Sequence, residues 1–230
     1  MNIYAVICTR SRKEISTTTD KLLSFLVSCG IRICLIEGSK SIYSSYHGAF
    51  EAIKPELDDI IIFCHDDIEI RETSDTFVEK LKNTLNEPAT GFVGPAGTTH
   101  LGESAIWWDE ALWQQRKHKG KVLHISHEGQ EFLTPYGPPG EVVVLDGLFL
   151  AAKPKVIREV GLQKPKFFEG EWDFYDIHYT SQAFLKGYAN RILDINIMHN
   201  SMGELVGRDS WHKNREAFIE NNDLPIKILD

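Results

Sequence analysis

Apolar residues form short, nearly continuous runs in the first third of the chain, and these runs alternate with segments of helical periodicity. The runs cover residues 2–8, 31–36 and 60–64. Such runs predict strands buried on both faces, because a strand with one face in water would alternate polar and apolar residues. The intervening segments, 16–29 and 43–53, predict helices that end at a glycine and before a proline. This order predicts an α/β fold with a mostly parallel central sheet flanked by helices.

Beyond residue 70 the pattern is less regular. Residues 91–97 predict a short strand that runs into a glycine-rich loop, and the Pro- and Gly-rich stretch 135–140 is irregular. No repeat or linker divides the chain, so we expect a single domain over 1–230, with a change in the sequence pattern near residue 98. The other predicted elements are helices over 73–85, 172–187 and 211–221 and strands over 141–152 and 191–198.

A histidine and three acids directly follow the third apolar run: His65, Asp66, Asp67 and Glu69. They lie at the carboxyl end of a predicted strand, where ligands bind in open α/β sheets. A divalent cation makes such crowded negative charge favourable. In an extended segment His65 and Asp67 would point the same way and Asp66 the other way, so the first two predict a metal site. Mn²⁺ tolerates an imidazole ligand better than Mg²⁺ does. The alternative is a turn with helix-capping aspartates.

His199 is a further candidate ligand, because it follows the apolar segment 192–198 and precedes a flexible Asn-Ser-Met-Gly sequence. A histidine at the carboxyl end of a strand could complete a metal site from a distance. The alternative is a surface histidine without a ligand, since the chain has nine histidines.

A second acidic cluster surrounds Trp172 and includes Asp173 and Asp176. A carboxylate there would serve as a general base if partial burial raised its pKa towards neutrality. The alternative is an acidic first helical turn, which the helix dipole favours. Trp107 and Trp172 are candidate platforms for sugar rings, although core packing is the commoner role of tryptophan.

Composition narrows the classes of partner. The formal net charge of the 230 residues is −8, which argues against a nucleic-acid binder that relies on long-range attraction to phosphate. The four cysteines lack CxxC spacing and predict free thiols in a reducing compartment. We find no apolar stretch of about 20 residues and no signal-peptide pattern, so the expected location is the cytoplasm, with no membrane span. GxGxxG and P-loop motifs are missing.

Taken in order, five segments of the chain resemble GT-A-fold glycosyltransferases of family 2, in particular a short bacterial glycosyltransferase-like branch. They span nearly the full length, and their combined order is more specific than any one of them. The segments are Val6-Ile-Cys-Thr9, Ser44-Ser-Tyr46-His47-Gly-Ala, Ile61-Ile-Phe-Cys-His65-Asp66-Asp67, Leu145-Asp146-Gly147-Leu-Phe-Leu150, and Phe174-Tyr-Asp176-Ile-His178 followed by Gly187-Tyr188 and His199-Asn-Ser-Met-Gly203.

The resemblance implies a nucleotide-diphosphate sugar donor, such as a UDP- or GDP-sugar, and a carbohydrate acceptor. Residues 1–97 would form the nucleotide-binding half, and residues 98–230 the acceptor half with a C-terminal tail. The implied roles are Mn²⁺ or Mg²⁺ binding by Asp67, His65 and His199, proton removal by Asp176 or Asp173, nucleotide binding by Thr9, Arg10, Glu37, Tyr46 and Asp66, and acceptor or sugar binding by Asp146, Gly147, Trp107 and Trp172.

Three positions depart from the family pattern. His65 replaces the first acid of the Asp-X-Asp metal motif, His178 replaces the second acid of the helix motif, and Glu37 stands where Asp is common. The leading hypothesis is therefore a metal-dependent glycosyltransferase that inverts the anomeric carbon, by analogy with the family. The alternative is a catalytically degenerate protein of the same fold that binds a nucleotide or sugar. Nucleotidyl transfer is a third hypothesis, which the lack of a glycine-rich basic loop at the chain start disfavours.

Overall fold

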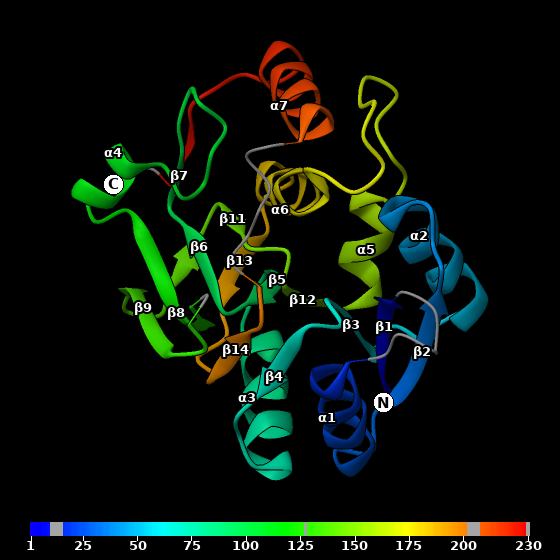
Figure 1. The fold of residues 1–230 in the computed structure, drawn as a ribbon. Coiled ribbons are helices and arrows are strands. Elements are labelled where there is room, and N and C mark those ends of the chain that lie inside the picture. The colour runs from blue at the N-terminus through cyan, green and yellow to red at the C-terminus, as the bar shows by residue number, and fades with distance from the viewer. Residues whose placement is uncertain (10–15, 127, 202–207, 229–230) are drawn as a thin grey trace.

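The computed structural model describes residues 1–9, 16–126, 128–201 and 208–228. The structure contains two large sheets and one small sheet, and helices flank the seven-stranded sheet, whereas β8 (His118–Ile125) and β9 (Glu131–Gly137) of the second large sheet lie at one side of the molecule (Figure 1). The helices of the described residues are α1 (Thr17–Ser28), α2 (Ile42–Ile53), α3 (Ser74–Asn86), α4 (Glu110–Gln114), α5 (Pro154–Val160), α6 (Tyr175–Leu185) and α7 (Asp209–Glu220).

A seven-stranded sheet forms the core, and the three apolar runs supply adjacent strands of it. Its order is β10 (Glu141–Val142), β13 (Ala189–Ile192), β5 (Thr90–Gly94), β12 (Phe149–Ala152), β3 (Ile60–Cys64), β1 (Ile3–Thr9) and β2 (Arg32–Glu37). Strands β2, β1, β3, β5 and β13 run in one direction, whereas β12 and β10 run in the opposite direction. The predicted α/β class with a mostly parallel central sheet is confirmed.

Burial on both faces explains why β3 reads as an unbroken apolar run. Every residue of β3 is at most 1% exposed. Helices α1 and α3 pack against each other, with the rings of Phe25 and Phe77 5.5 Å apart. On the other side α2 meets α6, where the rings of Tyr43 and Tyr179 are 5.8 Å apart. Figure 1 shows α1 and α3 below the sheet and α5 and α6 above it.

The second sheet has six strands and takes them from both halves of the chain. Its order is β11 (Val144–Leu145), β6 (Ala96–Thr98), β8 (His118–Ile125), β14 (Ile197–His199) and β4 (Ile68–Ile70), with β9 (Glu131–Gly137) paired to β8. A separate pair joins β15 (Ile226–Lys227) to β7 (His100–Leu101).

Several predicted boundaries were wrong, for one physical reason. The single strands predicted over 141–152 and 191–198 are each divided between the two large sheets, as β10, β11 and β12 and as β13 and β14. The residues at the first break remain buried, so the apolar pattern gives no sign of the change of sheet. The predicted glycine-rich loop is largely strand β6, where Gly97 lies so close to β11 that a Cβ would overlap the carbonyl oxygen of Val144.

Helix α6 begins later than predicted. Phe174, which precedes its first residue, has φ of +67°, a backbone conformation that cannot continue a helix from residue 172. The four cysteines are free thiols, as predicted. Within the described part of the chain, no helix combines the length and the apolar character that a bilayer span requires.

Candidate metal and glycosyl-transfer site

The candidate site forms where β3 ends and the chain turns into β4. The backbone N–H of His65 donates to the carbonyl of Leu148 on the neighbouring segment (3.0 Å), which fixes the start of the turn. Strand β4 then pairs antiparallel with β14, so that Ile68 lies opposite His199. The N–H of Asn200 donates to the carbonyl of Asp67 (2.8 Å). This pairing brings His199 beside Asp67 although the two residues are 132 positions apart in the sequence.

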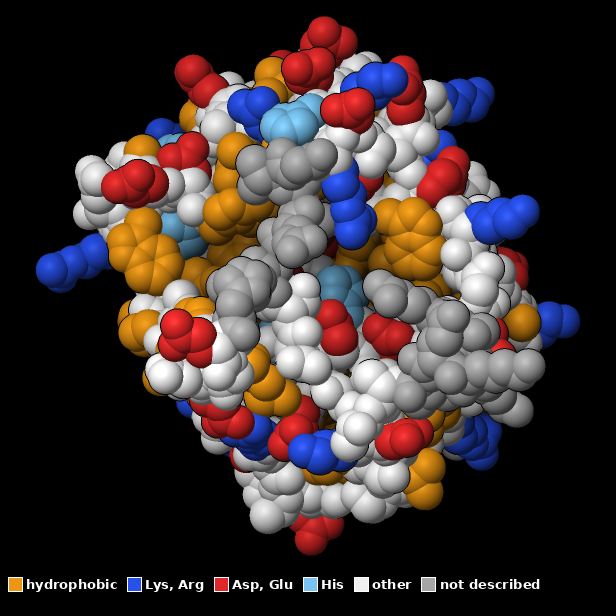
Figure 2. Space-filling view, in the orientation of Figure 1, with side chains coloured by type: hydrophobic (Ala, Val, Ile, Leu, Met, Phe, Trp, Pro, Cys, Tyr) orange, Lys and Arg blue, Asp and Glu red, His pale blue; other side chains and the backbone are white. Residues whose placement is uncertain are grey.

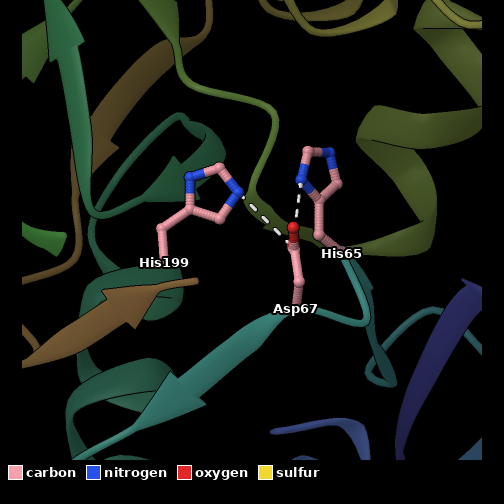
Figure 3. Close-up of side chains that lie close together, drawn as sticks. All are labelled: His65, Asp67 and His199. Atoms are coloured by element: carbon pink, nitrogen blue, oxygen red, sulfur yellow. Dashed lines mark ion pairs between the residues drawn. The ribbon is translucent and has the colours of Figure 1, made fainter. Parts of the chain in front are cut away.

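Three side chains converge on one point in this turn, as Figure 3 shows. Nε2 of His199 lies 3.3 Å from Oδ1 of Asp67, and Nδ1 of His65 lies 3.8 Å from the same oxygen. One potential ligand atom from each residue lies within 4.8 Å of the others. Glu69 does not join this group, because its carboxylate is paired with Lys21 (3.1 Å) and Arg71 (3.2 Å).

Tyr175 fixes the tautomer of His65. Its hydroxyl donates to the carbonyl of Gly147 (2.8 Å) and lies 2.8 Å from Nε2 of His65. A carbonyl oxygen only accepts, so the single tyrosine proton goes to Gly147 and Nε2 of His65 must donate to Tyr175. The lone pair of neutral His65 is therefore on Nδ1, the atom that faces Asp67.

Asp67 is paired with His199 and faces a neutral His65. Burial lowers the pKa of His199, but Asp67 outweighs it and raises this pKa, so the two residues form an ion pair that a bound cation would replace. Burial lowers the pKa of His65 to about 4, so its imidazole is neutral near pH 7. Burial opposes ionisation of Asp67, but His199 and His65 outweigh it and lower the pKa of this carboxyl. Oδ1 of Asp67 is nevertheless buried and accepts no hydrogen bond from the described residues. A buried carboxylate oxygen between two imidazole nitrogens, one of which presents a lone pair, fits a divalent cation with mixed oxygen and nitrogen ligands once His199 has lost its proton.

The carboxylates of Asp146 and Asp176 lie next to each other, close to the His65–Asp67–His199 cluster. Oδ2 of Asp176 accepts the N–H of Gly147 (3.1 Å), and Oδ1 of Asp146 accepts the N–H of Leu148 (3.1 Å). Burial and the neighbouring Asp146 raise the pKa of Asp176 to about 7. Burial also raises the pKa of Asp146, although His199 opposes this. Two like charges in a desolvated site disfavour simultaneous ionisation, which gives the pair a proton to exchange near neutral pH.

Asp173, the other predicted base, has different neighbours. Its carboxylate accepts the hydroxyl of Ser210 at the start of α7 (2.7 Å), and the residue is 3% exposed. A Cβ at Gly170 would lie 2.8 Å from its Oδ2. These contacts hold the turn before α6 against α7, so we favour Asp176 over Asp173 as the proton acceptor.

Of the predicted nucleotide-binding residues, Thr9, Glu37 and Asp66 lie at the same end of the sheet, and Tyr46 lies in α2. The hydroxyl of Thr9 donates to Oδ2 of Asp66 (2.6 Å), so these two residues form one contact, and Glu37 is paired with Thr9 in the β1–β2 register. Tyr46 is 1% exposed, and its ring lies 4.6 Å from that of Phe63. Arg10 lies outside the described residues. Nucleotide contact stays a prediction for all five.

The two predicted sugar platforms also differ. Trp107 is 3% exposed and packs against Tyr136 with ring centres 5.4 Å apart, so it offers little surface to a ligand. Trp172 is 38% exposed, and its Nε1 donates to the carbonyl of Lys40 (3.0 Å). Figure 2 shows hydrophobic and histidine side chains around the hollowed centre of this face, with acidic side chains among them.

Sequence reasoning missed Tyr175 and the contact of Asp176 with Gly147. Tyr175 stands directly before Asp176 in a motif that drew attention only for its acids. A Cβ at Gly147 would lie 2.9 Å from Cβ of Asp176, so this glycine allows α6 to approach the β11–β12 connection. No spacing rule reveals either contact, because each joins residues 28 or more positions apart.

Comparisons with known proteins identify the family and the fold. Residues 5–221 match the model of a family described as glycosyltransferase-like, and the chain belongs to this family. The fold is similar to that of A197 from STIV, a crystal structure with 16% sequence identity and a TM-score of 0.50, over 87% of this chain and 86% of that one. No curated protein matches the sequence. Family and fold together define a glycosyltransferase with a GT-A-like architecture.

Proposed function

We propose that the protein transfers a sugar from a nucleotide-diphosphate donor, such as a UDP- or GDP-sugar, to a hydroxyl of a carbohydrate acceptor, with Mn²⁺ or Mg²⁺ at the His65–Asp67–His199 cluster. The buried oxygen Oδ1 of Asp67, which has no hydrogen-bond partner among the described residues, carries this proposal. It lies between two imidazoles at the carboxyl end of β3, the side of an α/β sheet where ligands bind.

The residues of the cluster have different proposed roles in cation binding. When bound, the cation supplies positive charge that offsets the charge growing on the leaving diphosphate. His65 contributes the Nδ1 lone pair, which its hydrogen bond to Tyr175 directs, and Asp67 contributes the negative charge. Thr9 holds the carboxylate of Asp66 beside the metal ligands, at the position proposed for the nucleoside.

Asp176 is the proposed proton acceptor. In the reaction the acceptor oxygen forms a bond to the anomeric carbon, the bond to the diphosphate oxygen breaks, and Asp176 takes the hydroxyl proton. Its pKa of about 7 suits both the uptake and the later release of a proton at neutral pH. Direct attack from the face opposite the diphosphate inverts the anomeric configuration.

A thermal-shift experiment tests the metal and donor assignments together. We expect UDP or GDP to raise the melting temperature only when Mn²⁺ or Mg²⁺ is present, and we expect Asp67→Ala and His199→Ala to abolish the shift. Glu69→Gln is the matched control, because this carboxylate lies two residues after Asp67 but pairs with Lys21 and Arg71. Equal nucleotide binding in EDTA would contradict the proposed role of Asp67.

The degenerate-binder alternative predicts the same thermal shifts without turnover. His178, at the position of the second family acid, is a neutral group whose pKa burial lowers to about 4, and its ring packs 5.9 Å from that of Phe168. A panel of nucleotide sugars and acceptors separates the two hypotheses. Transfer or donor hydrolysis that Asp176→Asn removes supports the enzyme, whereas tight binding with no turnover of any donor supports the binder.

A further inference from the structure

A second concave site lies at the small sheet formed by β7 and β15, and it does not include any residue of the His65–Asp67–His199 cluster. Its volume is about 460 Å³. This lies within the range of about 300–1,000 Å³ found for small-molecule pockets. The charged and titratable groups that line it are His100, Lys117, Lys119, Glu141 and Lys227.

Strand alternation explains why two of the lysines face this pocket. His118 points inward, where it is 2% exposed and its Nε2 lies 2.6 Å from the carbonyl oxygen of Trp107. Successive side chains of an extended segment point to opposite faces, so Lys117 and Lys119 both face away from this aromatic interior.

Strand pairing supplies the other two basic groups. Lys227 of β15 lies directly opposite His100 of β7, so their side chains share one face of the small sheet. The carbonyl of Lys117 accepts hydrogen bonds from the backbone N–H (2.9 Å) and the hydroxyl (3.1 Å) of Thr99. These bonds hold Lys117 next to β7, and two separate segments, residues 117–119 and β15, therefore bring lysines to one concavity.

The positive charge of the pocket is not compensated within the described part of the chain. The ammonium groups of Lys117, Lys119 and Lys227 have no ion-pair or hydrogen-bond partner there. The carboxylate of Glu141 is paired with Arg191 (3.0 Å). Burial is the main cause that lowers the pKa of His100, and the positive charges of Lys117 and Lys227 lower it further. These two lysines therefore lie close enough to His100 to act on it electrostatically. Uncompensated positive charge stands out in a chain with a net charge of −8.

We propose that the pocket formed by His100, Lys117, Lys119 and Lys227 binds the phosphate group of a small organic phosphate ester. Lysine binds phosphate as a point charge, and a phosphate dianion would relieve the repulsion among the three ammonium groups. The pocket is larger than a single ion needs, so the organic part of the ester has room beside the phosphate. This proposal does not depend on the glycosyl-transfer function.

Calorimetry in EDTA tests the proposal, because chelation removes any cation that could hold phosphate at the other site. The probes are glycerol 3-phosphate, glycerol, inorganic phosphate, and phosphatidylcholine vesicles with and without phosphatidic acid. We expect glycerol 3-phosphate to bind and glycerol not to bind. We expect Lys117→Gln/Lys227→Gln to weaken binding about tenfold, as the loss of two partly exposed charge contacts implies. Higher salt should weaken binding to the unmodified protein.

The matched control is Lys155→Gln, which removes an exposed lysine from α5 and should bind like the unmodified protein. A thermal melt in phosphate-free buffer confirms that each variant is folded. Binding only to phosphatidic acid vesicles, lost in the double variant, identifies a lipid as the source of the phosphate ester. Equal affinity for glycerol 3-phosphate and inorganic phosphate would overturn the ester assignment. Equal binding by the double variant, or no binding of any phosphate probe, would overturn the pocket.

Discussion

Asp67 lies between two histidines, whereas Asp176 lies beside a second carboxylate, and the two aspartates respond in opposite directions. The neighbouring imidazoles lower the pKa of Asp67 against the effect of burial. Burial and Asp146 raise the pKa of Asp176 to about 7. One residue type therefore favours the ionised form at one place and the protonated form at another. Neighbouring groups, rather than residue type, therefore distinguish the proposed metal ligand from the proposed base.

We expect the largest effect from Asp176→Asn, which keeps the shape of the side chain and removes the proposed proton acceptor. We expect the transfer rate to fall about 10²- to 10⁴-fold, the usual contribution of a general base. Metal-dependent nucleotide binding should be retained, because the His65–Asp67–His199 cluster is unchanged. Steady-state kinetics and thermal shifts measure the two effects separately. Loss of both effects together would contradict the division of roles.

The same substitution should change how stability depends on pH. The folded pKa of Asp176 is raised, so the cost of its ionisation is absent below the ordinary aspartate pKa, grows as pH rises towards 7, and is complete above it. In EDTA, Asp176→Asn should therefore be more stable than the unmodified protein at pH 8, by on the order of 2–4 kcal/mol, with little difference at pH 4.

Denaturant unfolding at the two pH values provides the measurement for this stability change. Asp58→Asn is the matched control, because Asp58 is exposed and its replacement should not change the pH dependence. If the gain of Asp176→Asn were the same at pH 4 and pH 8, burial of a proton-binding pair would not be its cause.

Gly147→Ala tests whether the two regions share one scaffold. A Cβ at this position would meet the Tyr175 hydroxyl and lie 2.9 Å from Cβ of Asp176. We expect a loss of about 1–3 kcal/mol in the free energy of unfolding, as overpacking usually gives, together with weaker Mn²⁺ binding because Tyr175 is displaced from His65. Gly48→Ala, at an open position in α2, is the control. Unchanged stability and metal affinity would show that this approach is not needed.

Tyr175→Phe is the most selective change. It removes the acceptor that holds Nε2 of His65 while the ring remains in the core. We expect Mn²⁺ affinity to fall about tenfold, at the lower end of the effects reported for partners of metal ligands. The rate constant of the metal-saturated enzyme should change much less. Mn²⁺ titration by calorimetry gives the affinity, and an unchanged value would show that His65 needs no orienting partner.

Much of the first half of the fold could be predicted, because its strands are continuous and its helices have clear ends. Gly30, with φ of +70°, follows α1 as expected for a helix end, and Lys54 ends α2 before Pro55. The second half was harder. The segment 141–152 has an unbroken apolar pattern, yet the chain leaves the core sheet after β10, joins the second sheet as β11 and returns as β12. Burial is the same along this path, so hydrophobicity alone cannot locate the breaks.

The candidate site, like the fold, could be predicted from the sequence only in part. The sequence identified His65 and Asp67 from their position after β3, since local spacing controls which way they point. It named His199 only as an alternative to a surface histidine, and the β4–β14 pairing places it beside Asp67. The choice between Asp173 and Asp176 likewise required the contacts of Ser210 and Gly147.

The residue pattern predicted the largely buried strands β1 and β3, the mostly parallel core sheet and the acids after β3, because these properties depend on residues close together in the chain. Its prediction of burial on both faces for residues 31–36 was wrong, because β2 lies at the edge of the sheet. Only the fold shows which of those acids lie close together, which nitrogen of His65 keeps its lone pair and which lysines line one pocket. Each of these outcomes depends on contacts between groups far apart in sequence, and only the folded chain brings those groups within a few ångströms of each other.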